Sequence, residues 1–121
     1  MRVCSQPTAA PDGENTLNTV PANHDFRTLI DPMTFVCVDK SGSRIMIAEI
    51  DGRQVGFSIG VNAEEVTEIA LRLGAWNSTR FDGGGSSAMW AKKDGVSGLV
   101  SSPSDRKGER SCMNYMYVRK K

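Results

Sequence analysis

One stretch of the chain shows the spacing of apolar residues that is typical of an amphipathic helix. Apolar side chains recur at positions i, i+3, i+4 and i+7, which lie on one helix face: Val66, Ile69, Ala70 and Leu73. Asn62 and Glu65 are spaced as a capping box, and Gly74 is suited to the residue after the last turn. The pattern predicts a helix over about residues 62–73 that packs on a sheet.

The other apolar runs are short and rich in β-branched and aromatic residues, which is typical of strands. Residues 34–38 and 44–50 are joined by a short loop that contains glycine, and they predict a β-hairpin. The second of these runs is almost continuously apolar, so we expect a central strand that is covered on both faces. Further short strands are expected at 75–81, 87–91, 96–100 and 112–118.

Together these elements predict an α+β fold, in which a mixed, mostly antiparallel sheet carries one main amphipathic helix. The length of 121 residues fits one small domain. Residues 1–25 are rich in Pro, Asn, Thr and Ala and have little periodicity, so we expect an extended or flexible arm. Residues 26–121 would then form the folded domain.

Charge and hydropathy exclude several classes of function. The 15 basic and 14 acidic residues give a net charge of +1, which is no electrostatic footprint for nucleic acid. No apolar run has the length of a membrane span, and no cleavable signal peptide is visible in this chain. We therefore expect either a cytoplasmic location or export that is directed from outside this chain, within a larger assembly.

The cysteines and acidic residues predict neither a disulfide framework nor a cofactor. Three cysteines are too few and too scattered for a zinc site, and Cys37 and Cys112 lie in apolar surroundings that favour free buried thiols. A bridge between those two cysteines is the alternative. Three carboxylates could gather around a divalent cation, although their spacing is no metal signature: Asp51, Asp82 and Asp105.

The strongest candidate for chemistry is the stretch FDGGGSS at residues 81–87. Three consecutive glycines bury no side chain and cost backbone entropy, which indicates a close approach or amides directed at a ligand. A run of amides in a turn forms an anion-binding concavity, and Asp82 places a carboxylate at its rim. The alternative is a flexible turn in which Asp82 only caps the loop. The candidate ligand contacts here are Gly83, Gly84, Gly85, Ser86 and Ser87.

Further loops supply groups that a ligand with a sugar and a phosphate requires. Arginine binds phosphate through a planar fork, and the candidates are Arg53 and Arg110. A carboxyl group can protonate a glycosidic oxygen or stabilise an oxocarbenium-like centre. The candidate carboxyl groups besides Asp82 are Glu109, Asp51 and Asp105. The alternative for each arginine is a salt bridge to a near neighbour, Arg53 with Asp51 and Arg110 with Glu109.

Several spaced motifs resemble those of the phosphodiester glycosidases. In chain order they read DGRQVGFSIG, LRLGAW, FDGGGSSAM, PSDRKGER and CMNYMYV, and the resemblance extends from about Phe26 to Val118. It implies hydrolysis of a sugar-1-phosphate diester of the N-acetylglucosamine type at the sugar C1–O bond. The products would be the free sugar and a phosphomonoester.

The resemblance also implies roles for individual residues. Asp82 would be the main catalytic carboxylate, with Glu109 as its partner. The family usually has asparagine where this chain has Arg80, and this arginine would either add a phosphate contact or mark an altered specificity. The implied substrate-binding residues are Arg53, Gly83, Gly84, Gly85, Ser86, Ser87, Arg110, Asp51 and Asp105.

Family members also carry an upstream half with an NGGFF-like segment, which is not found here, so the chain resembles the C-terminal portion of the family's domain. Without that half a sheet edge would be unpaired, and we expect a homo-oligomer or a larger assembly. The expected ligand is a sugar phosphate or a polysaccharide. Two alternative functions are a non-catalytic module that binds carbohydrate or a cell surface through the glycine turn, and a structural subunit of a larger assembly.

Overall fold

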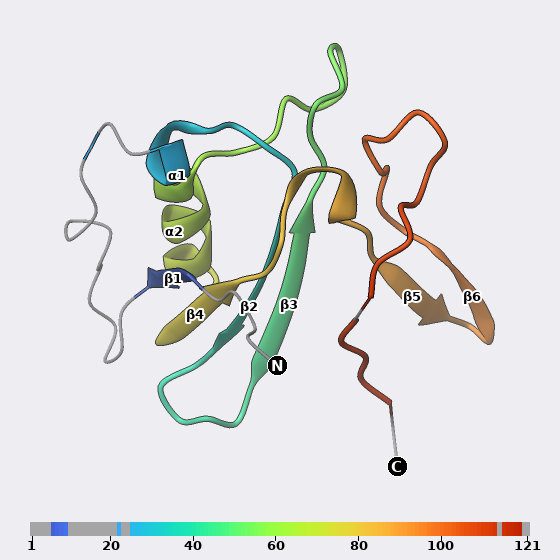
Figure 1. The fold of residues 1–121 in the computed structure, drawn as a ribbon. Coiled ribbons are helices and arrows are strands. Elements are labelled where there is room, and N and C mark those ends of the chain that lie inside the picture. Colours follow the sequence, from blue (N-terminus) through green and yellow to red (C-terminus); the bar gives the residue numbers. More distant parts are fainter. Residues whose placement is uncertain (1–5, 10–21, 23–24, 114, 120–121) are drawn as a thin grey trace.

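A four-stranded antiparallel sheet with one long helix on its face forms the centre of the molecule. A computed structural model describes residues 6–9, 22, 25–113 and 115–119. In chain order the elements are β1 (Gln6–Ala9), α1 (Asp25–Thr28), β2 (Met33–Val38), β3 (Ile45–Ile50), α2 (Ala63–Arg72), β4 (Asn77–Arg80), the 3-10 turn η3 (Gly84–Ser86), β5 (Trp90–Lys93) and β6 (Val96–Leu99). The sheet order is β1-β4-β2-β3, and β5 and β6 form a separate hairpin (Figure 1). The described strand pairs are antiparallel, which confirms the predicted α+β fold.

Helix α2 begins and ends where the sequence predicts. The Asn62 side chain accepts hydrogen bonds from the N–H groups of Glu64 and Glu65, and Glu65 Oε2 accepts one from the Asn62 N–H at 2.8 Å. This reciprocal capping box satisfies N–H groups that a helix start leaves without a partner. Gly74 follows the C-cap with φ +85°, in the left-handed region that favours glycine.

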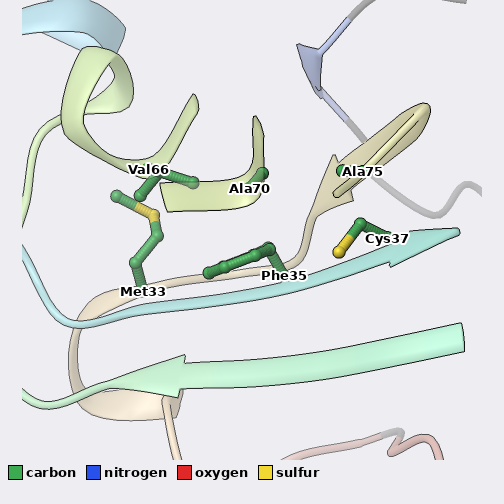
Figure 2. Packing of buried hydrophobic residues seen from close by; sticks show 6 residues of the cluster. All are labelled: Met33, Phe35, Cys37, Val66, Ala70 and Ala75. Atoms are coloured by element: carbon green, nitrogen blue, oxygen red, sulfur yellow. The ribbon is translucent and has the colours of Figure 1, made fainter. Parts of the chain in front are cut away.

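The core lies between α2 and one face of the sheet. Alternate residues of β2 point toward α2 and are buried, as strand geometry requires. The buried cluster, drawn in Figure 2, consists of Met33, Phe35, Cys37, Val66, Ala70 and Ala75. Burial raises the pKa of the Cys37 thiol. Cys37 and Cys112 are both free, one buried and one exposed, so the alternative of a bridge is not realised.

The prediction that residues 44–50 form a central strand is wrong. Strand β2 is central, between β4 and β3, and β3 lies at the edge of the described sheet. Met46 and Ala48 pack against the core, whereas Ile45 is 68% exposed on the opposite face. An open groove of about 420 Å³ lies at Ile45 and its neighbours Val36 and Val38. The continuous apolar run therefore has one covered and one uncovered face.

Two terminal segments also differ from expectation. Residues 6–9 of the predicted arm form β1, which pairs with β4; Cys4 lies outside the described residues. The strand predicted at 112–118 is wrong, because the described residues of that segment are not in a strand and Met113, Tyr115 and Tyr117 are exposed. Their alternating apolar pattern is therefore not accompanied by strand pairing in the described residues. Asn114 also lies outside the described residues.

The β5–β6 hairpin begins later than the pattern predicts. Residues 87–89 are not in a strand, because the Ser87 N–H donates to Gly84 O in η3 at 3.0 Å. The strands are joined at Asp94 and Gly95, which both have positive φ, as the tight turns of two-residue hairpins require. Among the described helices, none has the length and apolar character needed to cross a membrane.

Candidate active site

The glycine-rich turn follows β4 and uses several of its own N–H groups within the protein. The Gly83 N–H donates to Asp82 Oδ1 at 3.1 Å, so Asp82 does cap the loop. The Gly84 N–H donates to Pro32 O at 3.0 Å, and the Ser87 N–H donates to Gly84 O at 3.0 Å. Because these three N–H groups already have acceptors within the protein, the side chains around the turn are the better candidates for ligand contacts. The Asp82 residue is exposed.

Three arginine side chains lie against the three glycines of the turn. If each glycine carried a Cβ, this atom would lie close to the Nη2 atom of an arginine. The distance would be 3.7 Å between Gly83 and Arg80, 3.0 Å between Gly84 and Arg53, and 2.7 Å between Gly85 and Arg110. At two of these positions a Cβ would come closer than ordinary van der Waals contact allows. The absence of side chains on the turn therefore lets guanidinium groups pack on its backbone. We call Arg53, Arg80 and Arg110 the arginine cluster.

Arg53 is held by a carboxylate that the sequence analysis did not single out. Asp31 is buried, and its two oxygens accept hydrogen bonds from Arg53 Nε at 2.5 Å and Nη2 at 2.9 Å. The expected partner Asp51 is therefore wrong. Such a bidentate pair fixes the plane of the guanidinium, while the Arg53 side chain remains 47% exposed. Sequence spacing gave no signal for a pair whose members are 22 positions apart.

Arg110 is held in the same way by Asp105. Its Nε and Nη2 donate to the two Asp105 oxygens at 2.9 and 3.2 Å, and its side chain is 50% exposed. The expected partner Glu109 is again wrong. The hydrogen bonds and charge of Asp105 raise the pKa of Arg110, and the charge of Asp82 adds to this effect. The structure thus brings Asp82, Asp105 and Arg110 together at the turn.

Glu109 contacts a different group. Its Oε1 accepts a hydrogen bond from Trp90 Nε1 of β5 at 2.6 Å, and both residues are exposed. Glu109 therefore lies beside the cluster through its neighbour Arg110 and is directed toward the indole of Trp90. Trp90 lies within the strand expected at 87–91, and a tryptophan close to the glycine turn was the signal available in the sequence.

Asp51 forms hydrogen bonds that connect the loop after β3 to the loop at Ser102. Its Oδ1 accepts a hydrogen bond from the Ser102 N–H at 2.6 Å, and its carbonyl oxygen accepts one from Ser58 Oγ at 2.5 Å. Gln54 adds two more contacts, because its Nε2 donates to Ser102 O at 2.6 Å and its Oε1 accepts from Ser102 Oγ at 2.8 Å. This arrangement gives Asp51 a clear structural use.

The serines near the turn differ in exposure. Ser86 is half-buried, whereas Ser87 is buried and its Oγ has no hydrogen-bond partner within the described part of the chain. Ser104 Oγ is buried in the same unpartnered state. Of the two serines of the turn, Ser86 is therefore the one with a surface open to a ligand. Among the described residues, no group of three or more His, Cys, Asp or Glu is arranged to hold a metal ion.

Glu49 is a titratable group that the sequence analysis missed. It lies on β3 opposite Thr34, and its Oε1 is buried without a hydrogen-bond partner in the described residues. Burial, and secondarily the negative charge of Asp51, raise the pKa of Glu49 from 4.5 to about 7. A single acid within the apolar run of β3 was the signal that could have identified it.

The close approach at Gly83 gives a prediction about stability. A Cβ at this position would stand 2.8 Å from Pro32 O, and this backbone atom cannot move aside easily. We expect Gly83→Ala to lower the free energy of unfolding by about 1–3 kcal/mol, measured by urea denaturation. Gly98→Ala is the matched control, because a Cβ there has no neighbour within 4 Å. Equal stability of the two variants would contradict the packing described here.

Glu49 gives a prediction about pH. Between about pH 4.5 and 7 the unfolded chain loses the Glu49 proton while the folded chain retains it, so stability should fall as pH rises through this range. The loss should be roughly 1 kcal/mol after allowance for solvent screening at a partly exposed site. Glu49→Gln should remove this contribution in urea denaturation at pH 5 and 8, whereas Asp94→Asn in the exposed hairpin turn should retain it. An unchanged pH dependence in Glu49→Gln would contradict the assignment.

Comparison with known proteins agrees with the motifs of the site. A crystal structure of a Burkholderia pseudomallei protein inferred to be exported has 38% sequence identity to this chain, with a TM-score of 0.58. The match covers 67% of this chain and 15% of that protein, so this chain corresponds to a small part of that relative's length. No curated protein matches. The family model described as phosphodiester glycosidase matches residues 3–119, and the chain therefore belongs to the phosphodiester glycosidase family.

Proposed function

We propose that the chain carries the phosphate-binding and acid–base groups of a hydrolase that cleaves sugar-1-phosphate diesters at the sugar C1–O bond. The observation that carries this proposal is the arginine cluster on the glycine turn, with the exposed Asp82 beside it. Membership of the phosphodiester glycosidase family supports the same class of substrate. We take N-acetylglucosamine 1-phosphodiesters as the first substrates to test.

The phosphodiester would be bound by the open edges of Arg53 and Arg110. Each arginine uses Nε and Nη2 to contact its carboxylate, Asp31 or Asp105, so Nη1 is directed elsewhere. Both side chains are about half exposed, which leaves donor groups for an anionic oxygen. The carboxylates also offset repulsion between neighbouring guanidinium groups. Ser86 would add a hydroxyl group at the turn. Asp105 would act by positioning Arg110, and Asp51 would hold the loop at Ser102 in place.

Asp82 would be the main catalytic carboxyl group. As the C1–O bond breaks, the oxygen that stays on phosphorus needs a proton, and the sugar C1 acquires oxocarbenium-like charge. Water then supplies a hydroxyl group to C1, and the products are the free sugar and a phosphomonoester. Asp82 is close enough to Arg110 for their charges to interact, which supports a role for this carboxyl group beside a phosphodiester bound at Arg110. Glu109 is the proposed second carboxyl group.

Substitution of Asp82 tests this function. We expect Asp82→Asn to lower kcat for an N-acetylglucosamine-1-phospho-6-mannoside by about 10²–10⁴-fold, because a general acid or base contributes that much. Release of N-acetylglucosamine measures the rate, and circular dichroism checks that the fold is retained. Asp94→Asn is the control, since this exposed residue lies in the β5–β6 turn. Absence of turnover of any sugar-1-phosphate diester by the unaltered protein would favour a non-catalytic carbohydrate-binding module.

We also propose that a second copy of the chain pairs along β3. Edge strands in soluble proteins usually carry charged residues or proline that block pairing, and Ile45 is an exposed apolar residue on this edge. We expect light scattering to give a mass above that of one chain, and Ile45→Lys to lower it. Val96→Lys is the matched control, because Val96 is similarly exposed on β6. A monomer at high protein concentration would contradict this proposal.

A further inference from the structure

Trp90 is an exposed aromatic ring with one edge fixed. It is the first residue of β5, and 59% of its surface is exposed. Its indole N–H donates to Glu109 Oε1 at 2.6 Å, so the ring orientation is set by a charged acceptor. An exposed indole offers a ligand a large apolar face together with a polar N–H edge. The ring is therefore both accessible and oriented.

The other tryptophan of the chain provides a contrast. Trp76 is half-buried, and the ammonium group of Lys40 lies 4.4 Å from its ring centroid. A cation over the ring occupies one face of that indole. Trp76 thus has its ring engaged within the protein, whereas Trp90 has a fixed edge and a large free surface.

A chain of contacts connects Trp90 to the arginine cluster. Trp90 is bonded to Glu109, and the next residue, Arg110, lies against Gly85 and interacts with the charge of Asp82. Leu99 stands opposite Trp90 on β6 and is also partly exposed, which widens the apolar surface. The exposed apolar surface of Trp90 and Leu99 is thus joined, through Glu109, to the loop that carries Arg110.

The chemistry of this surface fits a sugar ring. A pyranose has a face of C–H groups that packs on an aromatic surface, and hydroxyl groups around its rim that need polar partners. Binding sites for such small molecules combine aromatic surface with a few fixed polar groups. Trp90 supplies the surface, and the exposed Glu109 carboxylate, which uses Oε1 for the indole, would accept a hydrogen bond from a hydroxyl group through its second oxygen.

We propose that Trp90, oriented by Glu109, is the platform on which the sugar ring of the substrate stacks. This inference rests on the proposed function, because it takes the phosphate to be bound at Arg53 and Arg110. It adds that the sugar lies on the β5–β6 side of the turn. Glu109 then acts both as the acceptor that positions the indole and as a contact for the sugar.

Tryptophan fluorescence tests the platform without any need for turnover. Trp76→Phe leaves Trp90 as the single tryptophan of the chain. Millimolar N-acetylglucosamine should change the Trp90 emission, N-acetylglucosamine 1-phosphate should do so at lower concentration, and inorganic phosphate should not. In Trp90→Phe the remaining Trp76 emission should not respond, and calorimetry should give about five- to tenfold weaker binding of the sugar phosphate, as expected for one aromatic contact.

Two substitutions of Glu109 separate its roles. Glu109→Gln retains an oxygen that accepts the indole hydrogen bond but replaces the second oxygen by an NH2 group, so Trp90 fluorescence anisotropy should be retained and sugar binding should weaken less than in Glu109→Ala. Glu109→Ala removes the acceptor and should lower both the anisotropy and the affinity. If Glu109→Gln weakens sugar binding as much as Glu109→Ala does, the positioning role is overturned.

The outcomes also distinguish the platform from the proposed function. One outcome is that the Trp90 emission does not change with N-acetylglucosamine or its 1-phosphate, while calorimetry still detects binding of inorganic phosphate. The sugar platform is then wrong, and the proposed phosphate site is supported. If sugars change the emission but no diester is hydrolysed, the platform is supported and the hydrolase proposal fails. If the emission changes with protein concentration and not with sugar, Trp90 is a contact between copies and the platform is overturned.

Discussion

Contact between guanidinium groups and bare backbone is the constraint on which the candidate site depends. A Cβ at Gly84 would collide with the Arg53 guanidinium. A Cβ at Gly85 would collide with both the Asp105 carboxylate and the Arg110 guanidinium. The positive φ of Gly84 adds a second reason for glycine. The glycine run is therefore explained by what packs on it, since the N–H groups of Gly83 and Gly84 donate within the protein.

The sheet and the site share the segment between α1 and β2. Asp31 is buried, binds Arg53 through its side chain and pairs with Val61 through its backbone. Pro32, the next residue, accepts the Gly84 N–H through its carbonyl oxygen. Two successive residues thus connect the start of β2, the approach to α2 and the glycine turn. The site is thus attached to the residues that directly precede the central strand.

Local features of the fold could be predicted from the sequence, and long-range ones could not. The capping box at Asn62 and Glu65 and the β2–β3 hairpin depend on neighbouring residues, so their spacing is sufficient to identify them. The edge position of β3 depends on which strands pair with it, and no spacing within residues 44–50 encodes that. The same reason explains the wrong ion-pair partners, because Asp31 is distant from Arg53 in the sequence. Residue types named the glycine turn, Arg53 and Arg110 as candidates, whereas the packing of the arginines on the turn depends on the fold and was not visible in the sequence.

Two hydrogen bonds between Gln54 and Ser102 connect the two loops that carry Arg53 and Arg110. Gln54 directly follows Arg53, and Ser102 lies three residues before Asp105, which holds Arg110. These hydrogen bonds join the two loops at one point. The relative position of Arg53 and Arg110 thus depends on contacts between uncharged groups, in addition to the ion pair that each arginine makes with its own carboxylate.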